Sequence, residues 1–161
     1  MKIVEATKIF EKLISRTDRK RKRKIYESFI AILTDLKSRK FTEDQTQSIE
    51  KELEGFDLNR SDQYKTRYFR KNLERFKQHL KTTFSLIPEG HYMSLGIAIG
   101  MTLGMTLGTS FGSVFGLPDG MTNGLSLGML IGMIIGLTIG KAKDAEAKKQ
   151  GNVYKVKLEE A

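Results

Sequence analysis

The chain has 161 residues and a formal net charge of +9, and it contains no cysteine. The lack of cysteine excludes a disulfide framework and a thiolate-bound metal site. The charge is unevenly distributed: residues 1–90 carry 22 Lys and Arg against 14 Asp and Glu, whereas residues 91–140 carry only Asp119. This division predicts a basic part exposed to water, followed by an apolar part.

Residues 1–88 predict a basic domain of about three amphipathic helices. A first helix over residues 3–38 is indicated by apolar residues at the spacing of one helical face, namely Ile25, Phe29, Ile32, Leu33 and Leu36. A capping box of Thr42 and Gln45 predicts the start of a second, shorter helix. A third is predicted from about Ser61 to Ile87, where Pro88-Glu89-Gly90 interrupts the chain.

Six consecutive basic residues lie inside the first predicted helix: Arg19, Lys20, Arg21, Lys22, Arg23 and Lys24. The run either continues the helix as a solvated stretch or breaks it. Its functional interpretation is contact with anionic lipid headgroups, which contributes ~1 kcal/mol per basic residue near a membrane surface. A solvated run without a ligand is an equal alternative, and nucleic acid is the least favoured partner because no zinc-finger or RNP-like pattern accompanies it.

Glycine recurs at every fourth position from Gly96 to Gly140, twelve times without a miss. Residues four apart lie nearly above one another on a helix, so the row forms a groove that a second helix can enter closely. In lipid a helix is enforced despite glycine's low propensity, because unpaired backbone groups there are very unfavourable. The glycines expected to pack helix on helix are Gly96, Gly100, Gly104, Gly108, Gly112, Gly116, Gly124, Gly128, Gly132, Gly136 and Gly140.

Residues 91–140 predict a transmembrane hairpin. Residues 92–116 and 121–140 can each cross a hydrocarbon core of ~30 Å, and Leu117-Pro118-Asp119-Gly120 has turn chemistry. Basic residues flank both outer ends and none lies in the turn, so the positive-inside rule places both termini in the cytoplasm. Residues 141–161 form a polar tail, whose first ten residues could prolong the second helix and whose end we expect to be loose.

A polar row accompanies the first predicted span. Thr102, Thr106 and Ser110 each follow a glycine by two residues, which places them away from the glycine groove. Their hydroxyls either bond back to carbonyls of their own helix or face another copy or a water-filled pore. We expect a homo-oligomer, with a conducting pore as one form of it.

The stretch SLIPEGHYMSLGIAIGMTLGMTLG, together with GLSLGMLIGMIIGLTIGKAKDAEAKKQG, resembles the bacterial glycine-zipper membrane proteins. These are small proteins with a GxxxG double-helix segment closed by a Lys-rich tail. The resemblance covers residues 85–151 and implies a transmembrane hairpin, but no established activity. The chain departs from the glycine-zipper outer-membrane lipoproteins, which carry a lipidated cysteine, so we expect a multi-pass protein of the bacterial inner (plasma) membrane.

The sequence therefore favours an all-α integral membrane protein that self-associates through its glycine rows, as an oligomeric pore or a membrane-perturbing effector. The alternative is a membrane tether, whose cytoplasmic helical domain recruits a protein partner or anionic lipid. No nucleophile, base and orienting group occur together, and no phosphate loop or zinc-protease motif is present, so we predict no enzyme, no cofactor and no metal site.

Overall fold

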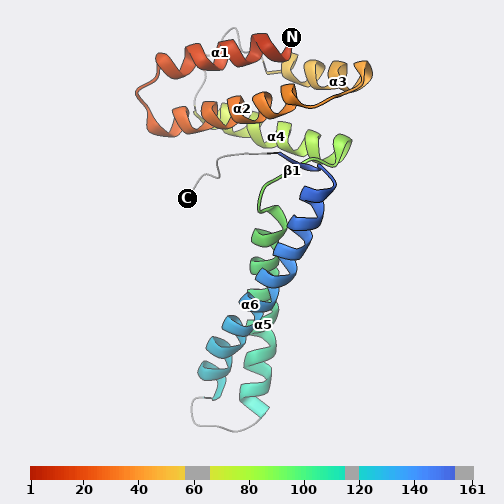
Figure 1. Cartoon of the computed structure of the whole chain (residues 1–161). Coiled ribbons are helices and arrows are strands. Elements are labelled where there is room, and N and C mark those ends of the chain that lie inside the picture. The colour runs from red at the N-terminus through yellow and green to blue at the C-terminus, as the bar shows by residue number, and fades with distance from the viewer. Residues whose placement is uncertain (57–65, 115–119, 155–161) are drawn as a thin grey trace. The chain divides into compact units, whose positions relative to one another are not determined.

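The structure is a computed structural model, and it describes residues 1–56, 66–114 and 120–154. These residues form six α-helices and two strands of two residues each, which confirms the predicted all-α class (Figure 1). The chain divides into two compact units, one formed by residues 1–87 together with Tyr154, and the other by residues 88–153.

The first unit contains four helices where about three were predicted. They are α1 (Ile3–Ser15), α2 (Lys20–Ser38), α3 (Glu43–Glu54) and α4 (Thr66–Phe84). The expected single helix over residues 3–38 is two helices, and the break precedes the basic run, which forms the first turns of α2. The break has a packing reason: α1 folds back so that the Phe10 ring stacks on Phe29 at 4.4 Å, which one straight helix could not allow.

Aromatic rings form the centre of this unit. Phe29 is fully buried, and its ring centroid lies 6.0 Å from that of Phe56 and 6.2 Å from that of Phe76. The rings therefore join α1, α2 and α4 with Phe56, which directly follows α3. The predicted capping box is present, because the Thr42 hydroxyl accepts from the Gln45 N–H at 3.4 Å and the Gln45 side chain accepts from the Thr42 N–H at 3.0 Å.

The third predicted helix ends earlier than expected. α4 stops at Phe84 because Ser85 has a φ of 55°, a left-handed conformation that ends the helix, and the Leu86 N–H donates to the Leu80 carbonyl at 3.1 Å. The predicted start at Ser61 lies outside the described residues.

Two short strands from distant parts of the chain pair with each other. β1 (Ile87–Pro88) pairs with β2 (Val153–Tyr154), so this part of the tail is not loose as predicted. The Tyr154 side chain is fully buried in the first unit, and its hydroxyl has no hydrogen-bond partner in the described part of the chain. Burial raises the pKa of this phenol above its ordinary value of 10.0, and the charge of Glu74 raises it further.

The second unit is a pair of antiparallel helices, α5 (His91–Val114) and α6 (Gly120–Lys149) (Figure 1). The expected span 92–116 corresponds to α5 and the expected span 121–140 lies within α6. Gly116 and the predicted turn residues 117–119 fall outside the described residues. α6 continues through Lys149, so the first part of the polar tail is helical.

Candidate functional site

The glycines of α5 and α6 face one another along the hairpin, and we call this contact the glycine seam. Each α5 glycine lies between two α6 glycines; for example, Gly104 lies against Gly128 and Gly132. The described members of the seam are Gly96, Gly100, Gly104, Gly108 and Gly112 on α5, and Gly120, Gly124, Gly128, Gly132, Gly136 and Gly140 on α6. Gly120 belongs to the predicted turn, but the structure places it at the start of α6, opposite Gly112.

The two backbones approach too closely for any side chain at the seam. A Cβ placed on Gly104 would lie 2.9 Å from the carbonyl carbon of Gly128 and 3.0 Å from the Cα of Gly132. Carbon atoms attract each other best at about 3.5–4.0 Å, and the atoms that such a Cβ would meet are rigid backbone. Glycine is therefore required here by the close approach of the helices rather than by its conformational freedom.

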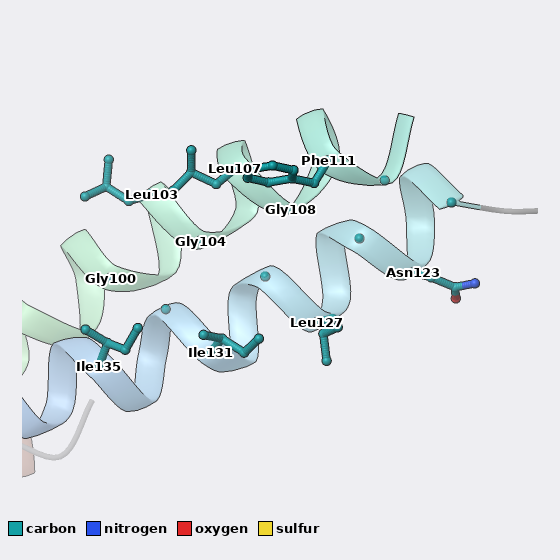
Figure 2. A pocket seen from close by; sticks show the side chains of 15 residues that line it. Gly100, Leu103, Gly104, Leu107, Gly108, Phe111, Asn123, Leu127, Ile131 and Ile135 are labelled. Atoms are coloured by element: carbon teal, nitrogen blue, oxygen red, sulfur yellow. The ribbon is translucent and has the colours of Figure 1, made fainter. Parts of the chain in front are cut away.

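One side of the seam is open. Figure 2 shows the labelled apolar side chains of α5 and α6 along a groove whose floor is the glycine backbone. The groove has a volume of 590 Å³ and is lined by Leu103, Leu107 and Phe111 of α5 and by Asn123, Leu127, Ile131 and Ile135 of α6. On the other side of the seam, some of the residues that directly follow the glycines, among them Met105 and Met129, are half-buried, whereas Met121 and Leu125 are exposed.

The outward surface of the hairpin is apolar and uncovered. No residue of α5 is buried, and Leu107, Phe111 and Ile134 are 58%, 61% and 63% exposed. Among the described helices, α5 and α6 are the two that are long and apolar enough to cross a membrane. Soluble monomers rarely present an apolar surface of this extent to water.

The predicted polar row uses its hydroxyl protons within its own helix. Thr102 donates to the Ala98 carbonyl at 2.9 Å, Thr106 to Thr102 at 2.9 Å and Ser110 to Thr106 at 2.9 Å. These bonds are the ones expected from the alternative in which the side chains bond to their own helix, and a facing second copy or pore stays a prediction. The row retains acceptor lone pairs, but its donors are already satisfied.

A polar clasp, missed in the sequence, closes the base of the hairpin. The Asp144 carboxylate of α6 accepts from the backbone N–H of Tyr92 and of Met93, each at 2.9 Å. These two N–H groups belong to the first turn of α5, where a helix leaves its donors unpaired and favours a negative charge. Asp144 therefore caps α5 although it lies 51 residues from Met93 in sequence. The antiparallel register of the two helices brings the carboxylate to the start of α5.

Two further contacts surround the clasp. Lys148 forms an ion pair with Glu89 at 3.4 Å, and the Lys143 ammonium lies 5.9 Å from the centroid of the Tyr92 ring. Both partners of the ion pair are largely exposed, so its contribution is small. The clasp therefore depends mainly on the two charge-assisted hydrogen bonds of Asp144.

The basic run lies at the start of α2, far in sequence from the hairpin. Arg19, Lys20, Arg21, Arg23 and Lys24 are exposed, whereas Lys22 is half-buried with its ammonium 5.6 Å from the Phe69 ring centroid. Arg23 pairs with Glu27 at 3.1 Å. The structure thus keeps the run on the surface and joins it to α4, a connection that the sequence did not reveal.

Comparison of the chain with known protein families, characterised proteins and solved structures finds no match.

Proposed function

We propose that the chain is an integral membrane protein whose α5–α6 hairpin anchors the helical domain of α1–α4 at a bilayer. The observation that carries the proposal is the combination of a glycine seam inside the hairpin and large apolar side chains on its outside. The backbone of each helix is satisfied within that helix, and the side chains that face outward suit hydrocarbon. These features favour a membrane tether, which holds a folded helical domain at the membrane surface.

The proposed topology has both ends of the hairpin on the cytoplasmic side of the bacterial inner membrane. The base of the hairpin carries Lys141, Lys143, Lys148 and Lys149, whereas the described residues at the other end carry no Lys or Arg. A cysteine introduced at Asn123 should react with a membrane-impermeant maleimide from outside the cell, and one at Lys149 should not. The reverse labelling would contradict the topology.

Membrane anchoring is tested by extraction and flotation. The full chain should float with membranes after a wash at pH 11 and should need detergent to enter solution. Replacing Leu107 and Ile131 with Lys should greatly reduce insertion, because each charge at a span centre costs about 2.5–3.5 kcal/mol by insertion scales. The matched control is Ala145→Lys, which lies on α6 beyond the predicted span. Wild-type protein recovered in the supernatant without detergent would overturn the proposal.

Self-association is a second candidate property, and the open groove is the feature that favours it. The glycines are already used inside one hairpin, so a second copy would have to pack against the apolar rims instead. Leu127→Ala with Ile131→Ala should then lower the mass of the detergent-solubilised particle. The matched control, Leu130→Ala with Ile134→Ala, changes the same helix outside the groove lining. Unchanged mass in both variants would remove the groove as a self-association surface.

An aqueous pore is the least supported form of self-association, because the hydroxyls of the polar row donate within their own helix. Release of a trapped dye from liposomes would support a pore, and dye retention at a high protein-to-lipid ratio would argue against it. The tether does not require dye release.

A further inference from the structure

Helices α2 and α4 run parallel, so their N-terminal ends lie at the same end of the first unit. The Tyr26 ring of α2 lies 5.1 Å from the Phe69 ring of α4. Three residues further along α2 and seven further along α4, the Phe29 ring lies 6.2 Å from the Phe76 ring. Residue numbers thus increase in the same direction along both helices. Figure 1 shows α2 and the described start of α4 beginning on the same side of this unit.

Both of these helix starts are basic. α2 begins with the run from Arg19 to Lys24, and α4 begins with exposed Arg67, Arg70 and Lys71. The first turn of α2 and the first described turn of α4 contain no acidic residue, whereas α1 has Glu5 and α3 has Glu43 and Asp44 in their first turns.

This arrangement is unfavourable for the folded protein by itself. A helix start carries a partial positive charge, which acidic side chains stabilise and basic side chains oppose by about 0.3–1 kcal/mol each. α1 and α3 follow the stabilising pattern, while α2 opposes it; residues 57–65, which precede α4, lie outside the described residues. Fold stability therefore does not account for the charges, and an anion bound at this end would relieve their repulsion.

Most of the basic side chains at this end are available to a ligand. Lys22 covers the Phe69 ring and Arg23 pairs with Glu27, which leaves seven exposed cations without an ion pair to any described residue. These seven are Arg19, Lys20, Arg21 and Lys24 of α2, and Arg67, Arg70 and Lys71 of α4. We call them the two-helix basic surface.

We propose that the two-helix basic surface binds the anionic phospholipid headgroups of the membrane that holds the hairpin. The proposal rests on the proposed function, because the tether keeps the domain at a high effective concentration beside that membrane. Each exposed Lys or Arg near an anionic bilayer contributes ~1 kcal/mol, which is about a fivefold change in binding.

Nucleic acid fits this surface less well. Proteins that bind single strands combine basic grooves with exposed aromatic rings on which bases stack. The two rings beneath the basic surface, Tyr26 and Phe69, are each 1% exposed, so they offer no face to a base. Tyr68, which lies between Arg67 and Phe69, is half-buried and donates its hydroxyl to the Phe56 carbonyl at 2.9 Å. The described rings at this surface thus offer little area for stacking, which suits a fluid layer of phosphate headgroups.

The test uses the full chain reconstituted in vesicles of phosphatidylcholine alone or with one quarter phosphatidylglycerol. Because the chain has no cysteine, Ser15→Cys gives a single site for an environment-sensitive dye beside the basic surface. The dye should report docking in the phosphatidylglycerol vesicles only, and 0.5 M salt should abolish it because salt screens exposed charges. Reversing Arg67, Arg70 and Lys71 to Glu should lower the docked-to-undocked ratio at least tenfold.

A matched variant makes the same change in net charge elsewhere. Reversing exposed Lys37, Lys40 and Lys51 to Glu should leave the docked-to-undocked ratio within about twofold of wild type. Equal loss in the two triple variants, or no docking by wild type, would overturn the proposal. A dye response to a single-stranded RNA oligonucleotide that phosphatidylglycerol cannot displace would also overturn it. Vesicle flotation is scored separately, so failure of the anchor is distinguishable from failure of the basic surface.

Discussion

Substituting Gly104 by alanine tests whether the two membrane helices depend on backbone contact. The added Cβ would meet backbone carbon atoms of Gly128 and Gly132 at 2.9 and 3.0 Å, whereas carbon pairs prefer about 3.5–4.0 Å. The helices must therefore separate by roughly 1 Å locally, and a gap of that size loses about a quarter to a half of each nearby dispersion contact. We expect a destabilisation of the hairpin by about 1–3 kcal/mol, the usual cost of overpacking.

The sign of this effect is informative. In an exposed helix, Gly→Ala stabilises by about 0.8–1 kcal/mol through helix propensity. In a micelle both helices stay helical when they separate, so this gain largely cancels between the packed and separated states. A net loss therefore reports packing alone.

The assay is steric trapping in detergent, with biotin attached at Ser94→Cys on α5 and at Lys141→Cys on α6. Binding of a second streptavidin requires the helices to separate, so its affinity gives the free energy of separation. Thr106→Ala is the matched control, because Thr106 is exposed on the same helix, and it should change this free energy by less than about 0.5 kcal/mol. If Gly104→Ala is as stable as wild type, the close-packed seam is refuted.

Three further predictions follow from individual contacts. Asp144→Ala should weaken the hairpin by about 1–2 kcal/mol and accelerate hydrogen exchange at the Tyr92 and Met93 amides by roughly tenfold, because it removes their cap. Phe29→Ala should lower the stability of the helical domain by about 3–5 kcal/mol in thermal unfolding followed by near-UV circular dichroism. The pKa of Tyr154 is raised in the folded state, so the unfolded state ionises first and stability should fall as the pH rises above 10.0. Tyr154→Phe should reduce that fall and leave stability at pH 7 unchanged or higher, since the buried hydroxyl has no partner among the described residues.

Each of these predictions has a result that would contradict it. Unchanged exchange at both amides in Asp144→Ala would show that water caps α5 as well as the carboxylate does. A loss below about 1 kcal/mol for Phe29→Ala would be incompatible with a closely packed ring cluster. A Tyr154→Phe protein that loses stability as steeply as wild type between pH 9 and 11 would assign the alkaline transition to other groups.

The sequence predicted those features of the fold that depend on local periodicity. A glycine at every fourth residue defines one helical row, so the packing face of α5 could be named before the fold was seen. The capping box of Thr42 and Gln45 likewise depends on residues three apart. The class of fold follows from these patterns, because helical periodicity and apolar length are properties of each segment alone.

Features that depend on distant parts of the chain were missed. The cap of α5 by Asp144 requires the register of the hairpin, which no local pattern states. The break after Ser15 was left open because basic residues are compatible with a helix, and it is decided by the stacking of Phe10 on Phe29. The proximity of the basic residues at the described starts of α2 and α4 was also missed. It depends on the parallel packing of the two helices, which the contacts between their aromatic rings define.

The periodicity of the hairpin also has a consequence for its alignment. Both helices repeat every four residues, so sliding one along the other by about 6 Å would again place glycine opposite glycine. The repeat thus offers several nearly equivalent alignments and cannot choose among them. Asp144 reaches the Tyr92 and Met93 amides in one of these alignments. A single carboxylate at the base of the hairpin therefore selects one register from a repeat that would otherwise permit several.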